Sequence, residues 1–98
     1  MIEVRERLEF SKWIRGLRDS EARARIAARI RRLAFEHFGD TKPVAAGVFE
    51  LRIHHGPGYR VYFVRRGATL IVLLCGGDKG SQDRDIAAAK KIAMELGQ

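Results

Sequence analysis

The sequence predicts an α+β fold, and three observations lead to it. Apolar residues recur at helical spacing in the N-terminal half, the stretch 50–75 alternates or is uniformly apolar as strands are, and a helical pattern returns near the C-terminus. The expected order is β-α-α-β-β-β-α, a small antiparallel sheet with two N-terminal helices and one C-terminal helix packed on one face. With 98 residues, we expect a single domain spanning 1–98.

The first half of the chain predicts one short strand and two helices. Met1–Arg5 fits the strand, and a stripe at i, i+3, i+4, i+7 spacing predicts the first helix: Phe10, Trp13, Ile14 and Leu17. Asp19 followed by Ser20 is a typical N-cap for a second helix that reaches about Phe38. We expect Thr41–Gly47 to be a connector.

The second half predicts a hairpin, a buried strand and a closing helix. Residues 50–66 form two strands joined by the turn Gly56-Pro57-Gly58, and Leu70–Cys75 is uniformly apolar, as a central strand is. Gly76–Gly80 is expected to be a loop, after which a helix begins near Asp83 as its N-cap.

Composition narrows the class of function. The formal net charge is +7, with 19 Lys and Arg against 12 Asp and Glu, which favours an anionic partner. Cys75 is the lone cysteine, so no internal disulfide forms, and with no signal peptide or membrane segment in view we expect a cytoplasmic protein without membrane partners. His54 and His55 are adjacent on a strand and point to opposite faces; the sequence predicts no metal site and no cofactor.

Along the hairpin, one of the two alternating sets of residues, which would share one face of the sheet, is polar: Arg52, His54, Arg60 and Tyr62. Paired strands would bring Arg52 and Arg60 to the same side, and Lys79 follows the next strand toward the same end. Two interpretations are open at this point. The residues either form a phosphate-binding surface or a solvated basic face in which Glu50 neutralises Arg52.

Four segments resemble one known group of proteins: Glu50–Arg52, Gly56–Phe63, Leu70–Lys79 and Gln82–Ala89. Their E-L-R, G-x-G-Y-R-V-Y-F, G-G-D-K and Q-x-x-D-I-x-x-A patterns resemble the RelE/ParE superfamily of toxins from type II toxin–antitoxin systems. The likeness is greatest to its HigB-like branch, the addiction module killer proteins.

The resemblance implies a metal-independent, ribosome-dependent mRNA endonuclease in which the ribose 2′-hydroxyl attacks the adjacent phosphate. It implies catalytic roles for Arg52, which takes the place of a strand lysine, for Arg60 and for Lys79. The remaining expected RNA contacts are Tyr62, Arg65, Arg66, Asp78 and Gln82. Glu50 replaces a second lysine of the RelE pattern, and Asp85 or Ile86 replaces its C-terminal tyrosine. His54 is our candidate general base and Tyr62 the weaker one.

The resemblance also implies a cognate antitoxin, a small helix-turn-helix protein. The second helix offers a face for it, for which we single out Arg25, Arg29, Arg32 and Phe35. Two other functions stay open: a ParE-like inhibitor of gyrase, and a nucleic-acid-binding module without catalysis.

Overall fold

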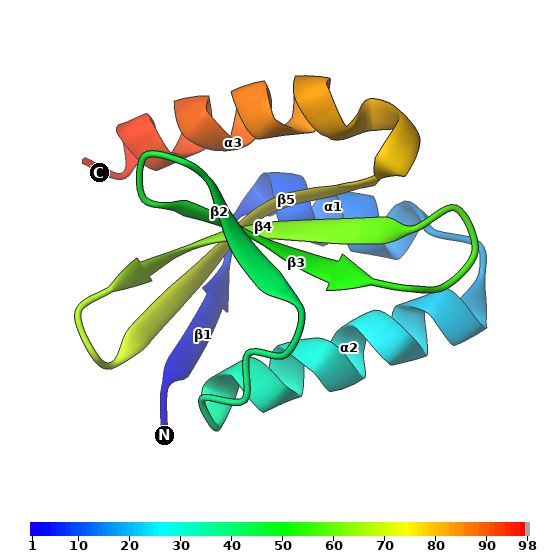
Figure 1. The fold of residues 1–98 in the computed structure, drawn as a ribbon, viewed down its shortest axis with the longest axis horizontal. Helices are drawn as coiled ribbons and strands as arrows, with labels where there is room; N and C mark the ends of the chain where they lie inside the picture. Colours follow the sequence, from blue (N-terminus) through cyan, green and yellow to red (C-terminus); the bar gives the residue numbers. More distant parts are fainter. Residues whose placement is uncertain (98) are drawn as a thin grey trace.

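The computed structural model describes residues 1–97, and within them five strands form one mixed sheet in the order β1-β5-β4-β3-β2. β1 pairs with β5 in parallel and the other neighbours are antiparallel (Figure 1). The elements are β1 (Glu3–Glu6), α1 (Leu8–Gly16), α2 (Ser20–Ala34), β2 (Thr41–Ala45), β3 (Val48–Ile53), β4 (Tyr59–Arg66), β5 (Leu70–Asp78), the 3-10 turn η1 (Lys79–Ser81) and α3 (Gln82–Glu95). The predicted α+β class is confirmed.

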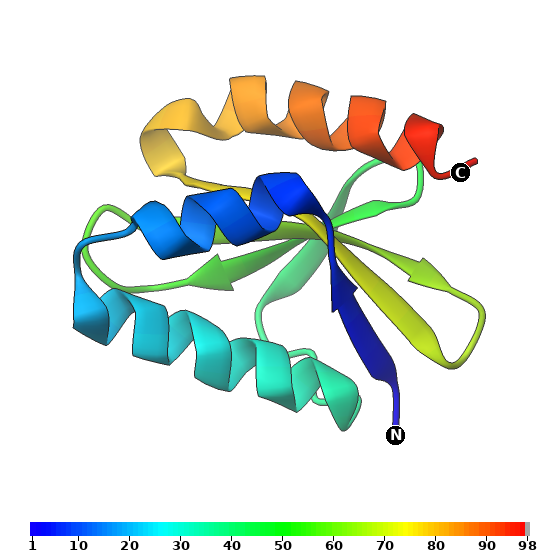
Figure 2. The ribbon, with the colours of Figure 1, turned by 180° about the vertical axis from the view of Figure 1, so that it is seen from behind.

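The helices cover both faces of the sheet, so the expectation of a single covered face is wrong. α1 and α2 pack on one face against Leu51 and Phe63, whereas α3 packs on the other against Tyr62 and Leu74 (Figures 1 and 2). β4 is apolar on both sides because Tyr62 and Val64 are buried as fully as Val61. A strand of this kind requires cover on both faces. No helix within residues 1–97 is long and apolar enough to span a bilayer.

The second helix is shorter than predicted, and the connector after it is a strand. Asp19 caps α2 as expected, accepting hydrogen bonds from the backbone N–H groups of Glu21 and Ala22. α2 ends at Ala34 and not at Phe38, because the chain turns at Glu36, which has φ +63°. The segment predicted as a connector forms β2 at the edge of the sheet, where a proline is tolerated in a strand.

The glycines after Cys75 belong to β5 and not to a loop. Gly76 faces the Trp13 ring and Gly77 faces the carboxylate of Asp85, at distances that leave no room for a Cβ atom. Asp78 ends the strand and caps η1 through the backbone N–H of Gly80 at 2.8 Å. α3 consequently begins at Gln82, one residue before the predicted N-cap.

We predict that Gly76→Ala destabilises the fold, since the added methyl group would overlap the Trp13 ring and force α1 away from β5. Overpacking of this kind costs about 1–3 kcal/mol, measurable by urea unfolding. Gly16→Ala is the matched control, because nothing lies within 4 Å of the Cβ position there. Equal stability of the two variants would contradict the close packing of Trp13 on β5.

Candidate functional site

A buried carboxylate, Glu50 on β3, lies at the centre of the candidate site. Its side chain is 0% exposed, and it accepts hydrogen bonds from Arg52 Nε at 2.9 Å, Gln82 Nε2 at 2.7 Å and the Tyr62 hydroxyl at 3.2 Å. Arg60 Nε lies 3.5 Å from the same carboxylate. The ion pair between Glu50 and Arg52, which belongs to the second of the two open interpretations, is therefore present, but as part of a larger cluster that joins β3, β4 and α3.

The protonation states follow from this burial. Burial by itself raises the pKa of a carboxyl group, but hydrogen bonds from Arg52 and Gln82 and the charge of Arg60 outweigh it, and the pKa of Glu50 lies below its ordinary value. Burial and the Glu50 charge raise the pKa of Tyr62. Glu50 is thus ionised at neutral pH, and Tyr62 is a protonated donor that is unsuited to act as a base.

The two arginines lie side by side, as strand parity predicts. Arg52 and Arg60 are register partners in the β3–β4 ladder. Their exposure differs: the Arg52 side chain is 28% exposed and that of Arg60 is 12% exposed. Arg60 also donates from Nη1 to the carbonyl of Gly58 at 2.9 Å, so it is held by the hairpin turn as well as by Glu50.

Lys79 reaches the same end of the sheet. A Cβ atom built on Gly58, which has φ +82°, would lie 3.3 Å from Arg60 Nη1 and 3.7 Å from Lys79 Cβ. The lysine also borders an open hollow along η1 and the first turn of α3, lined by Lys79, Gly80, Ser81, Gln82, Asp83 and Arg84. Arg52 and Arg60 are therefore neighbours on paired strands, and the base of the Lys79 side chain lies beside the Gly58 turn that holds Arg60.

His54 lies just beyond β3 and is joined to this site through Asp40. Its Nε2 is 2.5 Å from Asp40 Oδ2, while the backbone N–H of Arg52 donates to the carbonyl of Asp40 at 2.9 Å. The hydrogen bond from His54 is the main reason why the pKa of Asp40 is lowered. Sequence reasoning missed Asp40, because a contact between residues 14 positions apart leaves no spacing signal.

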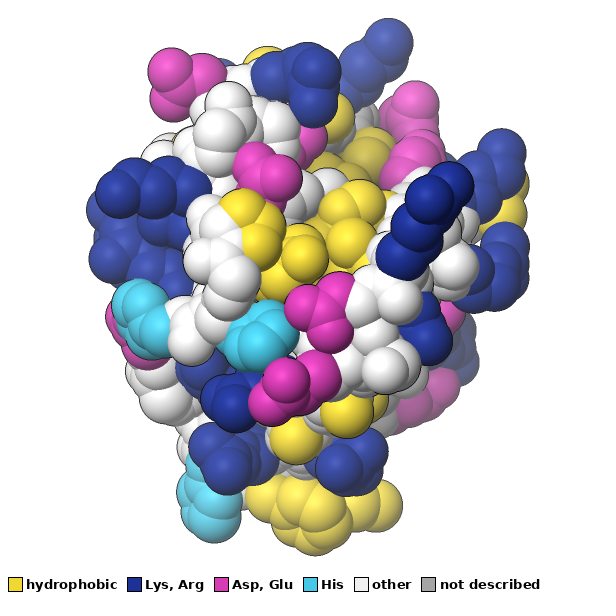
Figure 3. Space-filling view, turned by 90° about the vertical axis from the view of Figure 1, so that its right-hand side faces the viewer, with side chains coloured by type: hydrophobic (Ala, Val, Ile, Leu, Met, Phe, Trp, Pro, Cys, Tyr) yellow, Lys and Arg dark blue, Asp and Glu magenta, His cyan; other side chains and the backbone are white. Residues whose placement is uncertain are grey.

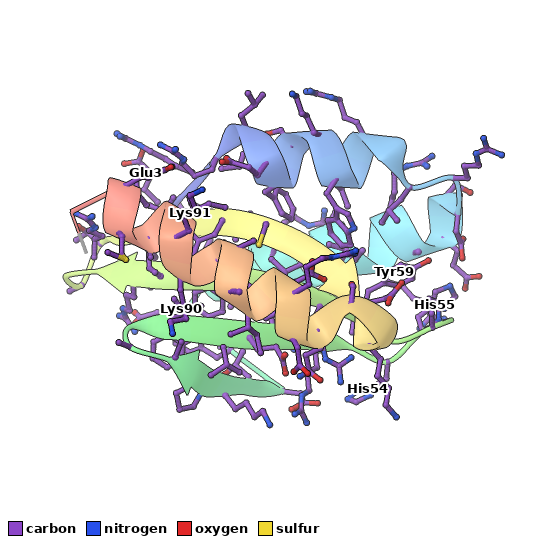
Figure 4. All side chains as sticks on the ribbon, turned by 90° about the horizontal axis from the view of Figure 1, so that it is seen from above. Glu3, His54, His55, Tyr59, Lys90 and Lys91 are labelled. Atoms are coloured by element: carbon purple, nitrogen blue, oxygen red, sulfur yellow. The ribbon has the colours of Figure 1, made fainter. Side chains whose placement is uncertain are left out.

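The adjacent histidine is occupied elsewhere. His55 Nε2 lies 3.1 Å from Asp19 Oδ2, at the N-terminus of α2. Figure 4 shows both histidines at the same end of the hairpin as Tyr59, pointing in different directions. Residues 1–97 include no group of three or more His, Cys, Asp and Glu side chains placed to hold a metal ion.

Other predicted RNA contacts lie outside the cluster or support it from inside. Tyr62 is fully buried under α3, so its side chain offers no surface to RNA in this structure. Arg65 and Arg66 lie at the far end of β4, with Arg65 about 16 Å from Arg60 along the strand. Arg65 is bonded to Glu36 at 3.3 Å, and Arg66 to the carbonyl of Leu96. Asp78 and Gln82 have structural roles, as the cap of η1 and as a donor to Glu50.

Residues predicted to meet an antitoxin divide into two groups. Phe35, Arg32 and Arg25 are exposed, and Arg25 has Glu21 as an ion-pair partner at 3.1 Å. Arg29 points toward the sheet and donates to the carbonyl of Arg52 at 2.6 Å. The second helix is thus physically linked to the strand that carries the site.

Cys75 is buried, as expected of a core residue. Burial raises the pKa of its thiol to about 12, so the thiol is protonated at neutral pH. This protonation state argues against a role as nucleophile.

Two comparisons with known proteins bear on the family. Residues 12–96 match the family model described as "Phage derived protein Gp49-like (DUF891)". The chain is also 51% identical over 96 residues to an uncharacterized protein of Haemophilus influenzae, an alignment that covers 98% of this chain and 97% of that protein.

We predict that Glu50→Gln lowers the free energy of unfolding at pH 7 by about 3 kcal/mol, because the arginines lose their buried counter-ion. The folded-state pKa of Glu50 is lowered, so its stabilising effect is present above the ordinary value of 4.5 and is lost as the pH falls below that value. Urea unfolding of both proteins at neutral and acidic pH should therefore show a difference that shrinks on acidification. Asp83→Asn, at an exposed position, is the control.

Proposed function

This chain belongs to the family of Gp49-like phage-derived proteins, which is related to the RelE/ParE-type toxins, and we propose that it is the toxin of a type II toxin–antitoxin system. We assign to it the metal-independent, ribosome-dependent cleavage of mRNA. One observation carries the assignment. Two guanidinium groups on paired strands, Arg52 and Arg60, are fixed by a single buried carboxylate next to a lysine at the surface.

The site fits the charge changes of this cleavage. The 2′-oxygen loses its proton and bonds to the adjacent phosphorus, the bond from phosphorus to the 5′-oxygen breaks, and that oxygen takes up a proton. The products are a 2′,3′-cyclic phosphate and a 5′-hydroxyl end. Negative charge develops on the phosphorane oxygens, and Arg52, Arg60 and Lys79 are the donors that stabilise it. Glu50 holds the arginines in place before RNA arrives, which avoids the cost of reorganising them.

His54 is the base in this proposal. Its side chain is 75% exposed, and Asp40 occupies Nε2, which leaves Nδ1 for the proton of the 2′-hydroxyl. A carboxylate on one ring nitrogen favours the tautomer that presents the lone pair on the other. The proposed base thus lies beside Arg52, because Asp40 contacts both residues.

A toxin of this kind is held inactive by a partner, and the family relationship implies a cognate antitoxin. We expect a small helix-turn-helix protein. The exposed Phe35, at the end of α2, is the large apolar side chain that this helix offers to such a partner.

We predict that Arg52→Lys slows mRNA cleavage by about 100-fold or more, because an ammonium group replaces the planar fork that can hold Glu50 and a phosphate together. Cleavage is measured by mapping RNA 5′ ends on programmed ribosomes, and toxicity by growth after induction. Arg52 is preferred to Arg60 for this test, since Arg60 is nearly buried against Glu50 and its removal would disturb the fold.

Arg15→Lys, at an exposed position of α1, is the matched control and should melt at the wild-type temperature. Arg52→Lys loses the hydrogen bond from Nε to Glu50, so its melting temperature is measured as well and cleavage is compared at a temperature where both variants are folded. Growth arrest with intact mRNA would contradict the nuclease assignment. Lost supercoiling in the same cells would instead indicate a gyrase inhibitor, and RNA binding without cleavage or arrest a plain binding module.

We also predict that His54→Ala reduces cleavage at pH 7 by about 100-fold or more without weakening the binding of mRNA. An mRNA with a 2′-O-methyl group at the susceptible position should behave in the same way with the wild-type protein: bound and not cut. His55→Ala is the control, because that neighbouring histidine contacts Asp19 and lies outside the cluster. Full activity of His54→Ala would place the base on another residue.

A further inference from the structure

A basic groove runs between α2 and the end of β3. Its lining consists of Arg25, Ala28, Arg29, Arg32, Ile53 and His54. Figure 3 faces the β3–β4 turn and shows Lys and Arg side chains in a band along its left edge, with histidines among them. The groove and the candidate site therefore share His54.

The positive charge of the groove is only partly neutralised. Arg25 has the exposed Glu21 as its partner at 3.1 Å, a pair that contributes little in water. Arg32 has no carboxylate within 4 Å among residues 1–97. Burial and the neighbouring charge of Arg32 lower the pKa of Arg29. Like charges held this close favour a bound polyanion.

The groove is also continuous with the site through the backbone. Arg29 Nη1 donates to the carbonyl of Arg52 at 2.6 Å, so one arginine of the groove is fixed to the strand that carries the proposed catalytic arginine. Arg25, Arg29 and Arg32 follow i, i+4, i+7 spacing and form a stripe about 10 Å long on one side of α2.

We propose that this groove binds the phosphodiester backbone of single-stranded RNA next to the nucleotide that is cut. The proposal rests on the proposed nuclease function and adds to it the path of the substrate strand. Arg31 extends the positive charge beyond Arg32, in a second hollow that shares Ala28 and Arg32 with the groove. A positively charged groove that follows the backbone is what the binding of a single strand needs.

The lining favours RNA over an acidic antitoxin helix at this position. An amphipathic helix docks through apolar side chains. The groove offers it only Ala28 and Ile53, and Ile53 is buried in the core. The remaining lining residues are three arginines, which match phosphates, and His54, the proposed base at the end of the groove.

The test measures RNA binding separately from cleavage. The probe is a short polyuridine strand with 2′-O-methyl sugars, which cannot be cut, and its dissociation constant is measured by fluorescence anisotropy over a range of salt concentrations. Removing one cation that pairs with a phosphate lowers the slope of log affinity against log salt by about 0.7 for a single strand. We expect Arg25→Ala/Arg32→Ala to reduce the slope by about 1.4 relative to the wild type, since two such cations are removed.

The matched control is Lys90→Ala/Lys91→Ala, which removes the same charge from the exposed side of α3, away from His54 (Figure 4). Its slope should equal that of the wild type. Equal slopes for the two double variants would overturn the proposal. So would an unchanged slope in Arg25→Ala/Arg32→Ala combined with failure to form the antitoxin complex, which would assign the groove to the antitoxin. Because the probe is not cleaved, a failure of the nuclease assignment leaves this result readable.

Discussion

The burial of Glu50 is the constraint on which the rest of the site depends. A carboxylate without access to water is costly unless hydrogen-bond donors and positive charge surround it, and here these groups come from three elements of the fold. Arg52 belongs to β3, Arg60 and Tyr62 to β4, and Gln82 to the first turn of α3. The ionised carboxylate of Glu50 therefore fixes the register of the hairpin and the position of α3 above it.

The position of α3 decides which cations reach the surface. This helix covers the face of the sheet that contains Tyr62 and Val64. The polar residues of the hairpin on that face therefore do not form an exposed basic surface. The three cations of the candidate site, Arg52, Arg60 and Lys79, lie where the sheet ends, near the β3–β4 turn and in η1. There Lys79 adjoins Arg60, and Asp40 joins His54 to Arg52. The candidate site is thus a narrow cluster at one end of the sheet.

Local patterns in the sequence were sufficient to predict much of this structure. Alternation around the Gly56–Gly58 turn predicted the hairpin and the pairing of Arg52 with Arg60, and Asp19 marked the start of α2. The strand β2 was missed because Pro43 and small residues weaken its pattern, and pairing with β3 determines it. Contacts far apart in sequence were also missed: Asp40 with His54, and Glu50 with Gln82, which is 32 positions away. Tertiary packing decides these features, and no short window of sequence contains them.

The hydrogen bonds of the cluster indicate different roles for Arg52 and Arg60. A guanidinium group has five N–H donors. Arg60 places Nη1 on the Gly58 carbonyl and turns Nε toward Glu50, and little of its side chain meets solvent, so its main task is to shape the turn and balance the carboxylate. Arg52 uses only Nε on Glu50, and among residues 1–97 no acceptor takes its two Nη groups. Those groups lie on the more exposed side chain, held at a fixed angle by a buried partner. Arg52 is therefore the residue with bidentate donors free for a phosphate, and Glu50 is the reason that they are held ready.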